Sequence, residues 1–332
     1  MTIETKSPMT TPLRLIPLLE PIRPEMGRVE HLLREALADV EEPLGAALRR
    51  VLEDGKRLRP ALVLLTGLTF AAPLDPFYSL AAAVDMLHAA TLIHDDLVDG
   101  SPLRRGQRTL HTAWPWEASV LAGDYLLAQA TSLVADLGQA RVLGVYGAVL
   151  RTMCAGEIRE MLVTQGRHGS REDYYSSIEA KTAALFAGSM EMAGLLAGAE
   201  EGQVAALRRF GRGFGMAFQI VDDVLDLTGD EAQLGKPAGS DLRQGLVTLP
   251  VLCYLERAEG ETLVNGVLAG ERDEEQMRGA IEAIRASGAI GAALEEARAY
   301  ARQSQAALAA LPDNAARRTL GALAGYVVER ER

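Results

Sequence analysis

The 332-residue sequence is poor in cysteine and in aromatic side chains, and it has no excess of positive charge. Its two cysteines, Cys154 and Cys253, lie far apart and outside any C-x-x-C pattern, which argues against a disulfide framework or a zinc knuckle and favours a reducing, cytoplasmic location. Lys and Arg number 34 against 45 Asp and Glu, a net charge of -11 that argues against nucleic acid as a partner. An anionic substrate must therefore be met by local basic clusters.

Long apolar runs and a leader sequence are also missing. The most apolar stretches, 61–74 and 77–93, are interrupted by Pro73, Asp85 and His88, so neither reaches the roughly 18 uninterrupted apolar residues of a membrane helix. The first residues contain no basic region followed by an apolar one, so no secretory signal is expected. We expect no integral membrane segment.

What is present predicts helices. No proline occurs between Pro115 and Pro237, and no stretch alternates apolar and polar residues as a half-buried strand does. Apolar residues instead recur at intervals of three and four, with short Gly, Pro or Asp turns between the segments; these segments are 29–52, 60–68, 79–98, 117–137 and 204–227. We predict an all-α fold, with an N-terminal extension at 1–28 and a single domain at 29–332.

The pattern Asp-Asp-x-x-Asp occurs twice, at Asp95, Asp96 and Asp99 and again at Asp222, Asp223 and Asp226. Residues three and four apart share one helix face, where like charges destabilise an isolated helix by about 0.2–0.5 kcal/mol per pair. The flanking residues are apolar, so something must neutralise the carboxylates. Magnesium binds through one or two carboxylates together with waters and substrate phosphates. The triplets therefore indicate Mg²⁺ bridging to a phosphorylated ligand.

Two other interpretations of the triplets were weighed. A single triplet in an acidic protein is as well explained by a solvated helix end, but two copies in apolar surroundings favour a site. A di-iron bundle requires Glu-x-x-His pairs on partner helices, and that pattern is absent from this sequence.

Basic residues supply the other half of a phosphate site. Lys56 and Arg59 lie one turn apart beside Gly55, and Arg104 and Arg105 follow the first triplet within a few residues. Lysine and arginine together can hold a diphosphate without metal. Either cluster alone is more often an ordinary surface with salt bridges, and their closeness to the triplet favours a site. His88 lies two turns before the first triplet, on roughly the same helix face.

These residues belong to an ordered series of motifs that resembles the trans-type polyprenyl diphosphate synthases, long-chain branch. The resemblance spans roughly residues 30–330. The motifs are Gly55-Lys-Arg-Leu-Arg-Pro60, Leu92-Ile-His-Asp-Asp-Leu-Val-Asp99, Leu103-Arg-Arg-Gly106, Val120-Leu-Ala-Gly-Asp-Tyr-Leu126, Lys181-Thr182 with Leu185-Phe186, Gly215-Met-Ala-Phe-Gln-Ile-Val-Asp-Asp223, Gly235-Lys236 and Thr248-Leu-Pro250.

The resemblance implies a helical bundle around a deep central cavity, with the two acidic helices facing each other across its mouth, and a homodimer. It implies head-to-tail condensation: an allylic diphosphate ionises, isopentenyl diphosphate attacks the cation through C4, and a proton is lost. Charge separation is the difficult step, and Mg²⁺ and cationic side chains stabilise the departing diphosphate. A water-poor cavity protects the carbocation.

The resemblance also assigns roles to single residues. It implies several Mg²⁺ ions per active site, held by the six triplet aspartates. It assigns the allylic diphosphate to Arg104, Lys181 and Lys236, and the metal-free diphosphate of isopentenyl diphosphate to Lys56, Arg59, His88 and Arg105. Thr182 and Gln219 would stabilise the cation and orient the released pyrophosphate, the expected proton acceptor.

Two positions depart from the family pattern. Where many relatives have lysine, Leu246 stands in Gly245-Leu-Val-Thr-Leu-Pro250, which removes one expected diphosphate contact. Asp54 occupies a common glycine position before Gly55.

Product length is argued from the helix that leads into the first triplet. The residues four and five positions before Asp95, Thr91 and Ala90, form the first level below the triplet. Leu87 and Val84 form deeper levels, and none of the four is aromatic. Short-chain relatives place Phe or Tyr near the first level, so long products of roughly seven to ten isoprene units are favoured by family analogy. Small residues that merely allow close helix packing are the alternative explanation.

Other functions remain open at this point. They are a farnesyl or geranylgeranyl diphosphate synthase, a subunit of a two-component synthase, a terpene cyclase and a ferritin-like metal protein. A non-catalytic subunit usually loses acidic triplets, and a cyclase does not need Lys56, Arg59 and His88 for a second diphosphate.

Overall fold

The computed structural model describes residues 15–53, 55–104, 106–163, 169–229, 238–257, 262–270 and 273–330. In these ranges the chain is helical except for turns and one short hairpin, in which β1 (Leu103–Arg104) pairs antiparallel with β2 (Gln107–Arg108). The all-α prediction is confirmed.

The first part of the chain contains α1 (Leu15–Leu19), η1 (Glu20–Ile22), α2 (Arg23–Glu35), α3 (Leu44–Glu53), α4 (Leu58–Thr69), α5 (Asp75–Val98), α6 (Leu110–Ala113), α7 (Trp116–Asp136) and α8 (Ala140–Val163). The second part contains α9 (Arg171–Ile178), η2 (Glu179–Ala183), α10 (Ala184–Leu196), α11 (Glu201–Thr228), α13 (Ser240–Gln244), α14 (Leu249–Leu255), α15 (Leu263–Leu268), α16 (Glu274–Ala286), α17 (Ala289–Ala307), η3 (Leu308–Ala310) and α18 (Ala315–Glu329).

Four of the five helices expected from periodicity are found within a few residues of their predicted ends, namely α4, α5, α7 and α11. The fifth expectation, one helix over 29–52, is wrong. The helix ends at Glu35 and a new one begins at Leu44. Pro43 lies in the gap, and its missing backbone N–H and fixed φ interrupt a helix even where the apolar spacing continues.

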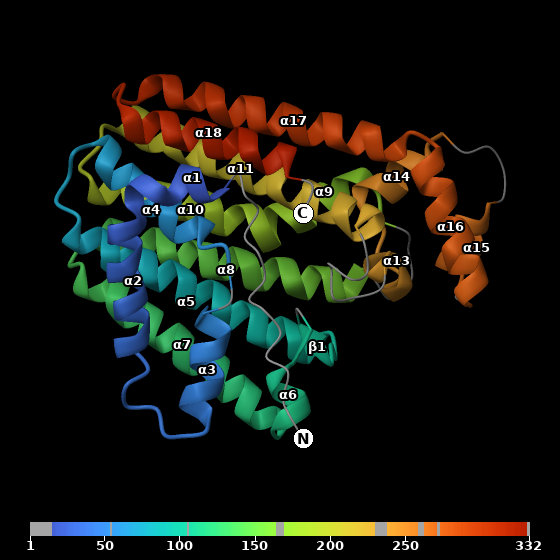
Figure 1. The fold of residues 1–332 in the computed structure, drawn as a ribbon, viewed down its shortest axis with the longest axis horizontal. Helices are drawn as coiled ribbons and strands as arrows, with labels where there is room; N and C mark the ends of the chain where they lie inside the picture. The colour runs from blue at the N-terminus through green and yellow to red at the C-terminus, as the bar shows by residue number, and fades with distance from the viewer. Residues whose placement is uncertain are drawn as a thin grey trace.

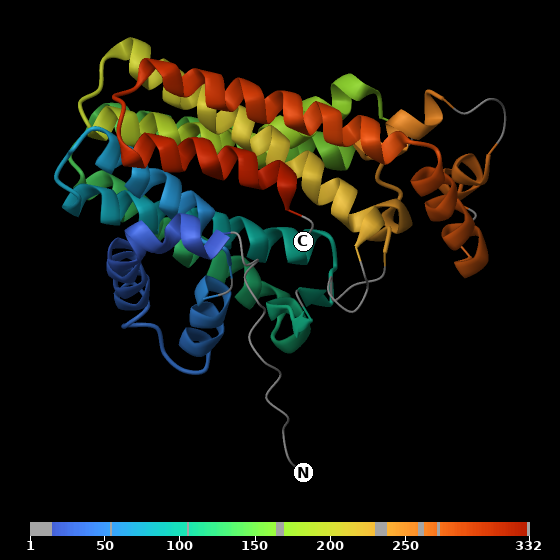
Figure 2. The same cartoon turned by 45° about the horizontal axis from the view of Figure 1, so that its top comes forward.

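The long helices lie roughly side by side in a layered bundle, from α17 and α18 at one edge through α11, α10, α8 and α5 to α7 at the other (Figure 1). Helix α10 contacts α11, α8 and α4, and α5 contacts both α4 and α7. Figure 2 shows α15 and α16 projecting beyond one end of this bundle. The C-terminal ends of α5 and α11, which carry the two triplets, lie toward that same end.

The start of the chain packs into the main core. Leu15, Ile22 and Met26 are buried there, although all three fall in the stretch expected to be an N-terminal extension. Hydrophobic burial of this kind stabilises the fold by about 25 cal/mol for each Å² of apolar surface removed from water. The described residues from 15 to 28 therefore form part of the bundle.

Glycines allow the closest helix contacts and so place the triplet-bearing helices. A Cβ atom at Gly123 of α7 would lie 2.2 Å from Nε2 of His94, and one at Gly215 of α11 would lie 2.6 Å from the Cα atom of Ala183. A larger residue at Gly123 would displace the His94 ring, and one at Gly215 would push α11 away from the backbone of η2. The first contact sets α7 against the last turns of α5, and the second sets α11 against η2.

Among the described residues, α5 and α7 are long and apolar enough to cross a membrane by length and composition alone. The most apolar window of α5 is 67% buried within the protein, as expected of a core helix, whereas that of α7 is only 33% buried. Helix α7 therefore presents an apolar face outward.

Candidate active site

The first triplet occupies the last turn of α5 and its C-cap. Asp96 is buried and accepts a hydrogen bond from Nε of Arg104 at 2.8 Å, because the β1–β2 hairpin turns back toward the helix end. Burial raises the pKa of Asp96, and Arg104 opposes that rise. Asp99 is exposed. The structure thus brings Arg104 to the triplet and pairs it with the middle aspartate.

Asp95 lies within the field of charges from three other elements, η2, α8 and β1. Burial raises its pKa to about 6; Lys181 and Arg104 oppose the rise, while Glu157 and Asp99 add to it. Nζ of Lys181 lies 3.0 Å from Oε2 of Glu157 on α8. The carboxylates at this point are only partly compensated by the protein's own cations, which is the situation a bound metal cation relieves.

Lys181 and Thr182 lie in η2, one turn of π-helix between α9 and α10. Such turns often occur at functional sites because the extra residue re-aims neighbouring side chains. Here Lys181 is directed toward the first triplet and Thr182 toward the second. Burial lowers the pKa of Lys181, but the carboxylates of Asp95, Glu160 and Glu157 outweigh it and raise the pKa overall. One helical turn therefore packs against α11 and α8 and places Lys181 within the field of Asp95.

A chain of hydrogen bonds fixes the second triplet. Thr182 Oγ1 donates to Oε1 of Gln219 at 2.7 Å, and Nε2 of Gln219 donates to Oδ1 of Asp223 at 2.9 Å. The hydroxyl of Tyr174 donates to the other oxygen of Asp223 at 2.6 Å. Asp223 is buried, and its pKa is raised by that burial and then by nearby Asp241. Both oxygens of Asp223 are thus held by neutral donors.

The remaining two aspartates of this triplet contact different elements. Asp226 is buried and accepts a hydrogen bond from the backbone N–H of Asp241 at 3.1 Å, at the start of α13. Asp222 is 40% exposed and accepts a hydrogen bond from Nη2 of Arg330 at 2.7 Å. Arg330, in the basic C-terminal end of the chain, thus reaches the second triplet.

Two arginines and two phenylalanines form a stack beside Asp222. The Arg330 guanidinium lies 4.1 Å from the ring centroid of Phe218, and that of Arg59 lies 4.2 Å from the centroid of Phe186. The two rings are 5.5 Å apart. Burial lowers the pKa of Arg59 to about 10, against the opposing charges of Asp85 and Asp222. Arg59, predicted to bind a diphosphate, is thus brought close to the second triplet.

The other predicted basic residues are only partly described. Lys56 lies half-buried in the loop before α4, and His88 is half-buried on α5, two turns before Asp95. Arg105 and Lys236 lie outside the described residues, as does Asp54.

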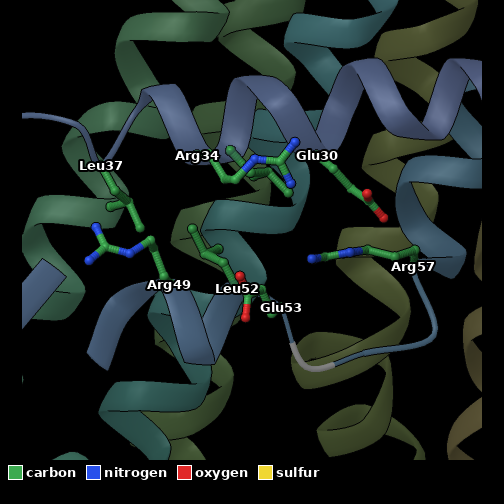
Figure 3. A pocket seen from close by; sticks show the side chains of 8 residues that line it. Glu30, Arg34, Leu37, Arg49, Leu52, Glu53 and Arg57 are labelled. Atoms are coloured by element: carbon green, nitrogen blue, oxygen red, sulfur yellow. The ribbon is translucent and has the colours of Figure 1, made fainter. Parts of the chain in front are cut away.

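A small cavity of about 140 Å³ lies away from the triplets, between α2, α3 and the loop before α4. It is lined by Glu30, Leu33, Arg34, Leu37, Arg49, Leu52, Glu53 and Arg57. Figure 3 shows Arg57 at one end of it and Leu37 and Arg49 at the other. None of the triplet residues lines this cavity.

The whole chain resembles known proteins. The family described as Polyprenyl synthetase matches residues 41–284. The chain belongs to this family. It is 38% identical over 308 residues to heptaprenyl diphosphate synthase component 2 of Geobacillus stearothermophilus, covering 92% of this chain and 96% of that one. It is 35% identical over 317 residues to nonaprenyl diphosphate synthase of Mycobacterium tuberculosis, covering 93% of each.

A solved structure agrees along the full length. The polyprenyl synthase from Caulobacter crescentus, crystallised with calcium and isoprenyl diphosphate, superposes with a TM-score of 0.88 at 36% identity, covering 98% of this chain and 100% of that one. The protein is therefore a polyprenyl diphosphate synthase, a prenyltransferase that acts on isoprenoid diphosphates.

The proposed chain-length positions of this synthase lie on α5. Val84, Leu87 and Ala90 are buried in the main core, and Thr91 is half-buried with its hydroxyl donating to the carbonyl of His88 at 2.8 Å. Their role in setting product length stays a prediction.

Three groups at the site of the synthase were missed by sequence reasoning. Glu157, Tyr174 and Arg330 each contact a predicted residue across a separation of at least 24 positions. Glu157 carried a weak signal, because Glu157 and Glu160 are acidic residues one turn apart on one long helix. Tyr174 carried no signal that hydrophobic periodicity reveals.

Leu246, the departure from the family pattern, lies near the second triplet. Its backbone N–H donates to the carbonyl of Asp241 at 2.9 Å, and the N–H of Asp241 itself donates to Asp226. Two backbone hydrogen bonds thus connect residue 246 to Asp226, a predicted metal-binding residue. A lysine side chain at this position would begin close to the second triplet.

Proposed function

We propose that this synthase condenses isopentenyl diphosphate head-to-tail with an allylic diphosphate and releases a long-chain, all-trans polyprenyl diphosphate. The observation that carries the proposal is the π-helical turn in which Thr182 is linked through Gln219 to Asp223 and Lys181 lies within the field of Asp95, with Arg59 stacked on Phe186 near the second triplet. The triplets provide carboxylates for one diphosphate, and Lys56 and Arg59 provide positive charge for another.

The allylic diphosphate is proposed to bind between the triplets. Asp95, Asp99 and Asp222 have the carboxylate oxygens that a hard divalent cation prefers, and each is at least partly accessible. Among the described residues no three His, Cys, Asp or Glu side chains form a ready-made cage, which fits a cation that completes its shell with substrate oxygens. Magnesium is the proposed ion, and when bound it would neutralise charge developing on the departing diphosphate.

The chain's own residues have distinct tasks in ionisation. Lys181, kept protonated by surrounding carboxylates, and Arg104 lie beside the first triplet and stabilise the leaving diphosphate as its charge grows. Thr182 and Gln219, hydrogen-bonded to each other, present oxygen atoms and dipoles between the helices. The buried apolar side chains of α5 and α10 keep water from the carbocation.

Isopentenyl diphosphate is proposed to bind at Lys56, Arg59, His88 and Arg105, without metal. The burial of Arg59 strengthens its interaction with an anion, because the surrounding dielectric is low. The proton lost from C2 would pass to the released pyrophosphate.

A long product is supported by the absence of aromatic side chains at Ala90, Thr91, Leu87 and Val84. Alanine at the level nearest the triplet leaves room where a phenylalanine or tyrosine ring would stop the chain. Two of the similar proteins are named for heptaprenyl and nonaprenyl products.

A homodimer is proposed through the outward faces of α7 and α8. Leu121 is 66% exposed, and Leu143 and Ile158 on α8 are also exposed. A Cβ atom at Gly144 or Gly147 would meet nothing within 4 Å, so this face is shallow enough for another helix to approach closely. Exposed apolar patches often mark protein contacts. The cytoplasmic location stays a prediction from cysteine usage.

The test is incubation of the purified protein with isopentenyl diphosphate, farnesyl diphosphate and Mg²⁺, followed by chromatography of the dephosphorylated products. Long polyprenols that disappear in Asp95→Ala and Asp222→Ala variants are expected. Products of three or four isoprene units would keep the reaction and refute the long-chain proposal. No turnover with any primer would indicate a required partner subunit, with Leu246→Lys as the first variant to examine.

A further inference from the structure

Asp85 is a buried carboxylate to which the proposed reaction gives no role, and it pairs with Arg57, which lies between Lys56 and Arg59 in the sequence. Asp85 is on α5, ten residues before Asp95, and its side chain is only 10% exposed. Nη1 of Arg57 donates a hydrogen bond to Oδ2 of Asp85 in an ion pair. Arg59 also feels the charge of Asp85, which raises the pKa of Arg59 against the effect of burial. Asp85 therefore pairs with Arg57 in the loop, and its charge also acts on Arg59 in the first turn of α4.

The loop needs an anchor because its backbone is strained. Arg57 has φ 52° and ψ 29°, the left-handed conformation, immediately before the first residue of α4. A non-glycine residue in this region costs about 1–2 kcal/mol and persists only where its surroundings hold it. On one side of Arg57 is the cavity between α2 and α3 (Figure 3), so packing from that side is incomplete. The ion pair with Asp85 is the contact that holds the Arg57 guanidinium.

The position of this anchor relates it to substrate binding. Lys56 and Arg59 flank Arg57 at one and two residues, and His88 follows Asp85 by three residues on the same face of α5. One buried carboxylate thus holds Arg57 between Lys56, in the loop, and Arg59, in the first turn of α4, next to the turn of α5 that carries His88.

We propose that Asp85 is a positioning residue that acts through Arg57 to hold Lys56 and Arg59 in the geometry that binds the diphosphate of isopentenyl diphosphate. The inference rests on the proposed assignment of that diphosphate to Lys56, Arg59 and His88. Asp85 itself touches no substrate.

The sign of the effect separates positioning from simple electrostatics. A negative charge near an anion site weakens anion binding through its field, so its removal alone would lower the KM for isopentenyl diphosphate. Positioning predicts the opposite, because the loop that carries the ligands loses its anchor. A misplaced charged hydrogen bond weakens binding by about tenfold or more.

The experiment compares Asp85→Asn, Asp85→Glu and wild-type enzyme in steady-state kinetics, each substrate being varied in turn. Asp85→Asn should raise the KM for isopentenyl diphosphate about tenfold, leave the KM for the allylic diphosphate within about twofold, and change kcat little. Asp85→Glu restores the charge and should recover most of the loss. Asp313→Asn is the matched control, because it removes a carboxylate that pairs with Arg317 and Arg318 far from the site.

An unchanged or lowered KM for isopentenyl diphosphate in folded Asp85→Asn would overturn the proposal, as would an equal rise in both KM values. If that variant does not fold, Arg57→Gly is the second test, because glycine adopts φ 52° without strain and only the ion pair is lost. The same selective rise is expected, and an unchanged KM overturns the proposal. Lys56→Ala tests the site assignment separately: if it leaves this KM unchanged, the proposed diphosphate site is wrong whatever Asp85 does.

Discussion

Replacing Arg330 by methionine should destabilise the synthase, although the residue is the last one described at the C-terminus. The Arg330 side chain is 1% exposed. Its Nη2 donates to Oδ1 of Asp222 and to the carbonyl of Phe218, each at 2.7 Å, and its guanidinium stacks on the Phe218 ring. Methionine keeps much of the volume and removes all three interactions.

The magnitude follows from these contacts. A hydrogen bond to a charged group contributes about 1.5–3 kcal/mol, one to a neutral carbonyl about 0.5–1.5, and a cation–π contact about 0.5–2. The lower ends apply, because Asp222 is 40% exposed and regains water once the arginine is gone. Relief of the buried arginine's desolvation offsets part of the loss. The net loss is about 2 kcal/mol, which lowers Tm by about 3 °C in a chain of 332 residues.

The assay is thermal unfolding of wild-type and Arg330→Met protein, with and without Mg²⁺. The variant should gain more stability from Mg²⁺ than the wild type, because its Asp222 carboxylate has lost the neighbouring cation. Arg318→Met is the control, since Arg318 is exposed and forms an exposed pair with Asp313, so Tm should change by under about 1 °C. An unchanged Tm in Arg330→Met would refute the reasoning, because desolvation of the arginine would then balance all three contacts.

Three further predictions concern product length, packing and pH. Ala90→Tyr should shorten the products, and an unchanged distribution by chromatography would contradict the chain-length assignment. Gly215→Val should lower stability by about 1–3 kcal/mol in denaturant unfolding and reduce turnover, because even a Cβ atom there would lie 2.6 Å from the backbone of η2. The pKa of Asp95 is raised to about 6 in the folded protein, so the folded state favours the protonated carboxyl group. The stability that this preference provides is fully present at low pH and is lost as the pH rises toward 6 and above. Without metal, Asp95→Asn should thus be more stable than wild type at pH 7 and closer to it at pH 5; equal Tm differences at both pH values would contradict this.

Several elements of the site were predictable because their signal is local. The triplets, the Lys-Arg loop and the Lys181-Thr182 pair are short patterns whose chemistry can be recognised from residue type and spacing. The pairing of Arg104 with Asp96 was harder to foresee, since both were expected to face the allylic diphosphate and its metal ions. A hairpin that turns back within eight residues brings them together before any ligand is bound.

The break between α2 and α3 shows the limit of periodicity. Apolar spacing of three and four continued through 29–52, yet the helix ends at Glu35 and a new one begins directly after Pro43. The outward face of α7 is a second example. Its composition suits a core helix or a membrane span equally well, and only its packing shows which side chains stay exposed.

The sequence by itself determined the helical class and the two acidic patterns with their basic partners, because helix periodicity and ligand chemistry are properties of neighbouring residues. The tertiary structure decided which charges meet. Lys181, in a π-helical turn, lies close enough to Asp95 for that carboxylate to raise its pKa. Arg330 donates a hydrogen bond to Asp222 across 108 positions, and Arg57 pairs with Asp85. These pairings depend on how glycine-mediated contacts set the helices against one another, and contacts over such separations leave no periodic trace in the chain.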